Sequence, residues 1–365
     1  MMQTINNSPS MQFGKLKTGR IMLIVFAALL PGISITTWFF GWGLLINLML
    51  ASILAYSLEA LALNIQKRPV KGSLSDNSAL VTAVLFGITV PPGSSWWLIL
   101  LGITFAILIA KHAYGGLGQN PFNPAMCGYL FLLLSFPLEM TSWQIPIDYI
   151  NSSPLGWEGF KQNLQAVFPV LSSNIESAQI TVDGKTIATP LITSKMVGTS
   201  AILEAQQSGL ALFARTSETG WELINISYML GGFALLSLRI ISWHIPFSII
   251  ATLIITSYWF HSSSTSTIFV VTYLHLFGSA TMIGAFFIAT DPVSAATTTK
   301  GKILYGIVIG LGIYFIREEN HHFGPVAIAI LFGNFCAPLL DYYCRPQIYG
   351  NSKQKRFLWF LRNRS

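Results

Sequence analysis

The chain has 365 residues, of which 52% are hydrophobic and only 10% are charged, whereas roughly a quarter of the residues of soluble proteins are charged. A net charge of +7 would indicate an anionic partner in a soluble protein. Here the positive charges lie between apolar segments and reflect membrane topology, so nucleic acid is not expected as a partner. The composition therefore predicts an integral membrane protein surrounded by the lipid bilayer. Cys127, Cys336 and Cys344 lie in or beside apolar segments without a Cys-x-x-Cys spacing, which favours packing over metal binding.

Ten apolar segments have about the length of a membrane helix, since a hydrocarbon core of about 30 Å needs about 20 residues. Five precede a polar stretch at 139–222 and five follow it. Those at 76–92, 123–138 and 302–316 are short or contain Pro, Gly or Asn, which predicts tilted, broken or re-entrant helices. The ten segments are 21–40, 43–65, 76–92, 95–112, 123–138, 223–240, 245–260, 267–289, 302–316 and 324–343.

The distribution of positive charge predicts the orientation, because cytoplasmic loops collect Lys and Arg. With the N-terminus inside, all but five of the 21 Lys and Arg residues lie on the inner side. Both termini are then cytoplasmic and the stretch 139–222 is periplasmic, in a bacterial inner membrane. The five on the outer side are Lys161, Lys185, Lys195, Arg215 and Arg317.

The two halves of the chain resemble each other in the order of the polar motifs that interrupt their apolar segments. Asp76–Ala79 is followed by Asn123–Ala125, and Asp291–Ala295 is followed by Asn334–Pro338. Five helices per half would reverse the second half relative to the first, as in many transporters; chance similarity between apolar stretches is the alternative. The predicted fold is an all-α integral membrane protein with about ten transmembrane helices, arranged as two inverted five-helix repeats. Its parts are a cytoplasmic N-terminus (1–20), a first half (21–138), a periplasmic loop (139–222), a second half (223–343) and a basic cytoplasmic tail (344–365).

A cluster of glycines and asparagines follows the fourth segment. Glycines allow tight turns and close approach of a ligand, and a helix that starts near Asn123 offers free N–H groups. The cluster therefore predicts the approach of a ligand at Gly115, Gly116, Gly118, Asn120 and Asn123, and the family resemblance given below implies that these are flavin or ion contacts.

A second polar cluster follows the eighth segment. Asp291 places a carboxylate at the end of a membrane helix, where an ionisable group is functional by default; the alternative is a helix N-cap before Pro292. With Ser294 and Asn334 it forms the second set of expected flavin or ion contacts. No metal site and no catalytic side chain is expected.

The polar stretch contains the motif Asp-Gly-Lys-Thr-Ile-Ala-Thr-Pro at 183–190. Gly184 permits a positive φ, and Pro190 fixes the backbone directly after the second threonine, so the turn exposes Thr189. The motif is similar to the sequence at which flavin transferases attach FMN to a threonine hydroxyl. Its residues are Asp183, Gly184, Thr186, Ala188 and the acceptor Thr189.

These three motifs together resemble the D subunits of the Rnf (Rsx) electron-transport complex, and less closely the B subunit of the sodium-pumping NADH:quinone reductase. The likeness spans nearly the whole chain. It implies covalent FMN at Thr189, a flavin transferase for maturation, a second non-covalent flavin (riboflavin), and membrane and peripheral partner subunits of one complex.

The sequence contains no Gly-x-Gly-x-x-Gly after a strand and no iron–sulfur cysteine pattern. Electrons must therefore pass through partners, between ferredoxin-type and NAD-type pools. The predicted function is a flavoprotein subunit of a redox-driven ion translocase, active only within its complex. The alternative is an inverted-repeat solute channel or transporter, similar to urea channels, without redox function.

Overall fold

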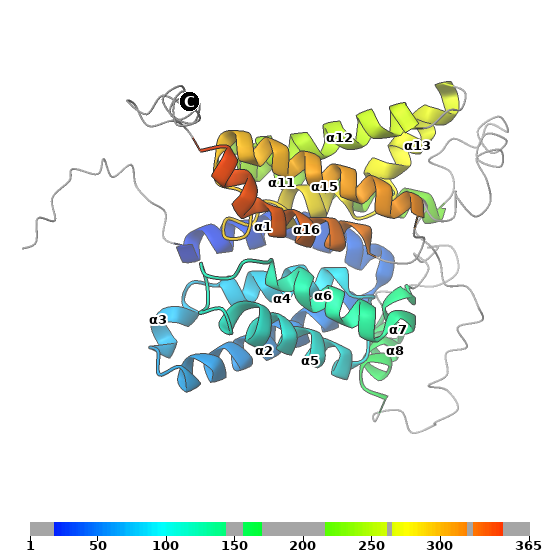
Figure 1. Ribbon diagram of the computed structural model, residues 1–365. Coiled ribbons are helices and arrows are strands. Elements are labelled where there is room, and N and C mark those ends of the chain that lie inside the picture. Colours follow the sequence, from blue (N-terminus) through cyan, green and yellow to red (C-terminus); the bar gives the residue numbers. More distant parts are fainter. Residues whose placement is uncertain (1–17, 144–155, 170–215, 261–264, 320–323, 346–365) are drawn as a thin grey trace, which may run out of the picture.

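The computed structural model describes residues 18–143, 156–169, 216–260, 265–319 and 324–345. Within these residues all regular secondary structure is helical (Figure 1). Each of the ten predicted segments falls on one helix or on two or three consecutive helices. The flavin motif at 183–190, with Thr189, lies outside the described residues.

The first half consists of helices α1 to α6, and two short helices, α7 and α8, follow it in the chain. Two of these helices, α4 and α6, have 12 residues each, or about 18 Å at 1.5 Å per residue, which is less than a bilayer core. The elements are α1 (Thr18–Phe40), α2 (Trp42–Ile65), α3 (Val70–Leu74), α4 (Ser78–Thr89), α5 (Trp96–Thr104), the π-helix η1 that continues it (Phe105–His112), α6 (Pro124–Ser135), α7 (Pro137–Thr141) and α8 (Trp157–Val167).

The second half begins with α11 at Thr216, seven residues before the predicted start at 223. Its third segment is divided into a helix, a short helix and a π-helix. The elements are α11 (Thr216–Ser237), α12 (His244–Phe260), α13 (Thr265–Phe277), α14 (Thr281–Ile283), the π-helix η4 (Gly284–Ile288), α15 (Thr299–Glu319) and α16 (Pro325–Tyr343).

Among the described residues, four helices (α1, α2, α15 and α16) are long and apolar enough to cross a membrane, and the bent pair made by α13 with α14 and η4 gives a fifth candidate. Of the predicted tilted, broken or re-entrant forms of the segment 302–316, the broken form is excluded, because α15 is continuous through it. The break lies at 277–281, where the chain bends by 59°. There the carbonyl of His275 accepts hydrogen bonds from the hydroxyl of Thr281 at 2.6 Å and from Arg317 at 2.7 Å, and these side chains replace helical amides.

The two halves meet along α1 and α11, whose glycines allow close approach. A Cβ at Gly32 would clash with the ring of Tyr228, and a Cβ at Gly231 would clash with the carbonyl of Ala28. Since lower numbers on α1 face higher numbers on α11, the two helices run antiparallel. In Figure 1 the start of α1 and the end of α16 lie on one side of the molecule, and α7 and α8 lie on the other.

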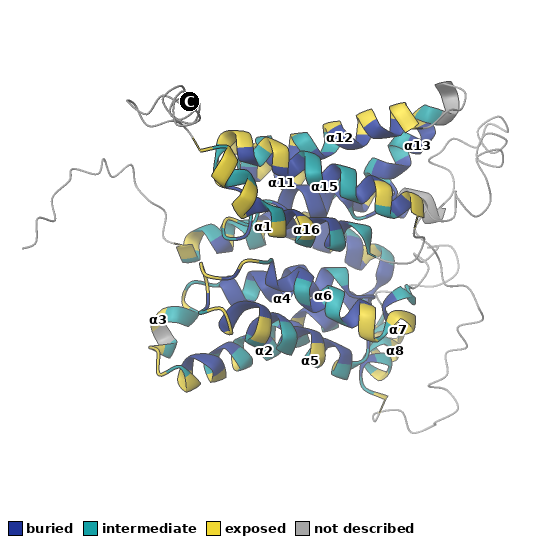
Figure 2. Cartoon of the chain, in the orientation of Figure 1, coloured by how far each residue is buried: buried dark blue, intermediate teal, exposed yellow. Residues whose placement is uncertain are grey.

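Burial follows this arrangement (Figure 2). Buried residues gather between the helices, whereas large apolar side chains such as Ile53 on α2 and Phe335 on α16 are exposed, at 64% and 71%. An exposed apolar perimeter of this kind suits lipid and would be unstable in water.

Candidate functional site

A cavity of about 480 Å³ lies between the two halves, and both predicted polar clusters contribute to its wall. Its residues come from α1, α4, η1, the glycine turn, the start of α6, the end of α11, η4 and the turn after η4. We call it the charged cavity, because Lys111 and Asp291 both line it. Two stretches that are far apart in the sequence are thus brought to one site.

The predicted glycine-rich turn is present, and its glycines have left-handed backbone conformations. Gly115, Gly116 and Gly118 have φ values of +109°, +95° and +90°, which residues with a Cβ rarely adopt. Arg68 donates to the carbonyl of Gly115 at 2.6 Å and ties the turn to the end of α2. Gly118 lines the charged cavity, whereas Gly115 and Gly116 shape the turn behind it.

The two asparagines of this cluster act differently. The helix α6 begins next to Asn123, as predicted, and Asn123 is its N-cap, since its side chain accepts from the amide of Met126 at 3.3 Å. It also donates to the carbonyl of Ile288 at 3.4 Å and so joins the two halves. Asn120 donates to the carbonyl of Phe122 at 3.0 Å, but its buried Oδ1 has no hydrogen-bond partner in the part of the chain that the structure describes.

Asp291 lies in the turn between η4 and α15, and its carboxylate accepts from the hydroxyl of Ser294 at 2.7 Å. The alternative that it caps a helix is wrong, because the next helix, α15, begins at Thr299. Burial raises the pKa of the Asp291 carboxyl, and hydrogen bonds from Ser294 and Val293 oppose that rise. Asn334 lies apart from the charged cavity on α16, where it accepts from the hydroxyl of Tyr305 at 2.7 Å.

A buried ion pair includes one of the residues that line this cavity. The ammonium of Lys111 lies 2.7 and 2.8 Å from the two carboxylate oxygens of Glu59 and donates to the hydroxyl of Ser78 at 2.7 Å. Lys111 is 1% exposed and Glu59 is 2% exposed. The ring of His112 approaches the same carboxylate, with Nε2 at 3.6 Å.

This pair was not predicted from the sequence. Lys111 was counted among the charges of the inner loops, whereas it is buried within η1. A signal was present, since Glu59 and Lys111 are the only Asp, Glu, Lys or Arg residues within 43–65 and 95–112. Charges inside apolar helices are costly unless paired, so each predicts a partner on another helix.

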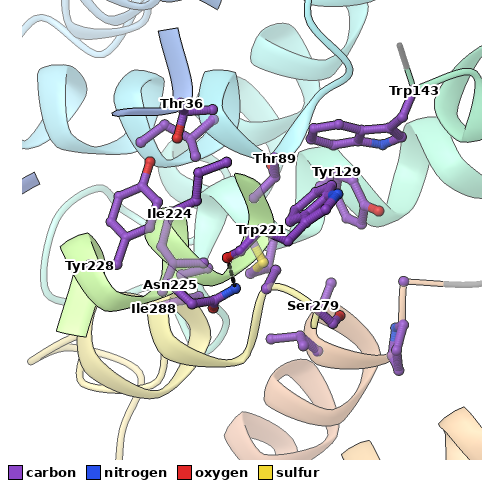
Figure 3. Close-up of a pocket in the computed structure, with 18 of the residues that line it drawn as sticks. Thr36, Thr89, Tyr129, Trp143, Trp221, Ile224, Asn225, Tyr228, Ser279 and Ile288 are labelled. Atoms are coloured by element: carbon purple, nitrogen blue, oxygen red, sulfur yellow. Dashed lines mark hydrogen bonds between the residues drawn. The ribbon is translucent and has the colours of Figure 1, made fainter. Parts of the chain in front are cut away.

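A second, smaller cavity of about 150 Å³ lies between the same halves (Figure 3). We call it the aromatic cavity. The Tyr228 hydroxyl points toward Thr36 (Figure 3) and has no hydrogen-bond partner among the described residues, while Asn225 is satisfied by Phe277, Trp221 and Met282. The aromatic rings on its wall belong to Phe40, Tyr129, Trp143, Trp221 and Tyr228.

The two cavities are arranged along the same helices. On α1, Met22 lines the charged cavity and Thr36 lines the aromatic cavity, and between them Leu29 is fully buried. On α4, Thr82 and Thr89 take the corresponding places, with Phe86 buried between them. Closely packed side chains and the bond from Asn123 to Ile288 therefore separate the cavities at a waist.

In the part of the chain that the structure describes, fold and site together define a helical membrane protein with two cavities at the interface of its halves. Residues 4–350 match the model of the NQR2, RnfD, RnfE family. The chain belongs to this family, in agreement with the resemblance of its motifs.

Three relatives, each named as the D subunit of an ion-translocating oxidoreductase complex, are 43% identical to this chain. The protein of Aeromonas salmonicida aligns over 92% of this chain and 95% of its own length, that of Erwinia tasmaniensis over 93% and 96%, and that of Aliivibrio salmonicida over 96% and 99%. These names support the redox prediction and not the channel alternative.

Proposed function

We infer that the chain is a membrane subunit of an oxidoreductase complex that couples electron transfer to ion translocation across the membrane. The observation that carries this conclusion is the match to subunits of this name over more than nine tenths of both chains. Deleting the gene should abolish electron-driven ion transport in membrane vesicles, and the chain supplied in trans should restore it. Unchanged transport without the chain would contradict the assignment.

We propose that ten helices cross the membrane as two inverted repeats. Helix packing supports this arrangement, because α1 contacts α4 as α11 contacts α14, and α2 contacts α5 as α12 contacts α15. The antiparallel contact between α1 and α11, the first helix of each half, is the relation that an inverted repeat requires.

The positive-inside rule then places both termini in the cytoplasm of a bacterial cell and the region around 139–222 in the periplasm. A reporter that is active only in the periplasm should work when fused near Ser173 and should be silent after Ser365; the opposite pattern would reverse the topology.

We propose that the flavin motif carries covalent FMN at Thr189, attached by a flavin transferase. The support is the full spelling of the motif together with the family of the chain. A denatured band of the chain should fluoresce when the transferase is co-expressed, should lose fluorescence in Thr189→Ala, and should keep it in the control Thr186→Val. Fluorescence retained in Thr189→Ala would contradict the acceptor assignment, and loss of Asp183 should weaken attachment.

We propose that the charged cavity holds the second, non-covalent flavin. The residues fit this group: the volume of about 480 Å³ lies within the range of ligand pockets, and the unsatisfied Oδ1 of Asn120 can accept from a ring N–H. The chemistry that a flavin supplies there is exchange between two-electron and one-electron carriers.

The test of this site uses Asn120→Leu, with Gln119→Leu on the exposed neighbour as its control. The flavin released by acid from the purified complex should fall severalfold in Asn120→Leu alone, while the covalent fluorescence remains. Equal release from both variants would exclude Asn120 as a flavin contact.

We propose that the translocated cation enters the charged cavity from the cytoplasmic side and meets Asp291, whose carboxylate and the nearby hydroxyls of Ser294 and Thr290 are ligands that hard cations prefer. The waist blocks direct passage to the aromatic cavity. This closed barrier between two cavities is what a coupled pump requires, because an open channel would dissipate the gradient.

A further inference from the structure

The carboxylate of Asp341, in the last turn of α16, accepts four hydrogen bonds from two consecutive threonines. Thr297 donates its amide at 2.7 Å and its hydroxyl at 2.9 Å to Oδ2. Thr298 donates its amide at 2.9 Å and its hydroxyl at 2.7 Å to Oδ1. Hydrogen bonds to an ionised acceptor are about twice as strong as neutral ones, so this group firmly fixes two adjacent backbone positions.

These bonds lie where α15 begins. The Thr298 hydroxyl also accepts from the amide of Gly301 at 3.1 Å and so caps the helix. A Cβ at Gly301 would lie 2.7 Å from Oδ1 of Asp341, so glycine leaves room for the carboxylate. Negative charge at this position also complements the positive end of the α15 dipole.

The residues so held form the far end of the turn that carries Asp291. The turn runs from 291 to 298. At its first end the carbonyl of Asp291 accepts from the amide of Ala295 at 3.2 Å, and its carboxylate accepts from the Ser294 hydroxyl. Asp291 lines the charged cavity, whereas Asp341 does not.

We propose that Asp341 is a positioning residue: its clasp on Thr297 and Thr298 holds the turn so that Asp291 faces the charged cavity. The link to ion coupling rests on the function proposed for that cavity. The clasp itself is independent of that function and can be tested separately.

The experiment uses the purified complex with Asp341→Ala, and with Leu339→Ala as the control, because Leu339 lies in the same part of α16 and is 58% exposed. Hydrogen exchange at the Thr297 and Thr298 amides should accelerate about tenfold in Asp341→Ala, as expected when a charge-assisted bond is lost, and should not change around Ile309. The electron-transfer rate is then measured against NaCl concentration and against pH. The NaCl concentration at half-saturation, or the proton concentration at the midpoint of the pH profile, should change at least threefold. The maximal rate should change less than twofold.

Asp341→Glu keeps the carboxylate on a longer arm and should recover more than half of both effects, whereas Asp341→Asn, with one acceptor oxygen left, should lie between parent and Ala. Unchanged exchange at Thr297 and Thr298 would overturn the clasp. Faster exchange with the cation dependence of the Leu339→Ala control would overturn the positioning role. In both cases a cation dependence lost in Asp291→Asn would leave the proposed function standing.

Discussion

The charged cavity and the aromatic cavity lie along the same helices but differ in the side chains that line them. In the first, Lys111 donates to Glu59 and to Ser78 at 2.7 to 2.8 Å, and Asp291 accepts from Ser294. In the second, the described lining residues include five aromatic rings and no charged side chain. Charge inside a membrane protein is retained at a cost. Among the residues that line the two cavities, Lys111 and Asp291 belong to the charged cavity, which is where we propose that the ion and electron chemistry takes place.

The largest expected effect comes from breaking the buried ion pair. Lys111→Met leaves Glu59 as an uncompensated buried charge, which costs about 3 to 5 kcal/mol. The variant should accumulate as little assembled complex, and the double variant Glu59→Gln/Lys111→Met should restore much of it. Lys67→Met, at an exposed lysine, is the control, and normal assembly of Lys111→Met would show that the pair is not structural.

The waist should be the next most sensitive region. Gly32→Ala forces a methyl group into the ring of Tyr228, and overpacking of this kind costs about 1 to 3 kcal/mol. The apparent melting temperature of the purified complex should fall by several degrees. Gly72→Ala, which has open space around it, should leave the melting temperature unchanged; equal melting of both variants would show that the contact between α1 and α11 is not tight.

A smaller change in free energy, with a specific functional readout, is expected at Asp291. Asp291→Asn preserves shape and the bond to Ser294 but removes the charge, so assembly and flavin content should be normal. Ion transport per electron should fall at least tenfold, which corresponds to about 1.4 kcal/mol. Coupling equal to that of the parent chain would reduce Asp291 to a turn residue.

The smallest effect is expected in the aromatic cavity. Tyr228→Phe removes a hydroxyl that has no partner among the described residues, so stability should change by less than about 0.5 kcal/mol. Transport should also be close to that of the parent. A large loss of either would show that the hydroxyl binds a group essential to function and that the two cavities are more alike than their walls indicate.

The sequence by itself determined the class of protein, the positions of the apolar helices, the helix start near Asn123 and the glycine-rich turn before it, because length, hydrophobicity and local backbone preference act between near neighbours. It also determined the family, since the matching motifs are read directly from the residues. Only the tertiary structure decided that Lys111 is buried against Glu59, that the turn of Asp291 ends on Asp341, and that the third segment of the second half is the broken one. Each of these features depends on a hydrogen-bond partner at least 36 residues away. A charged or polar group in a membrane takes the position in which such a partner satisfies it. Local sequence does not specify that partner.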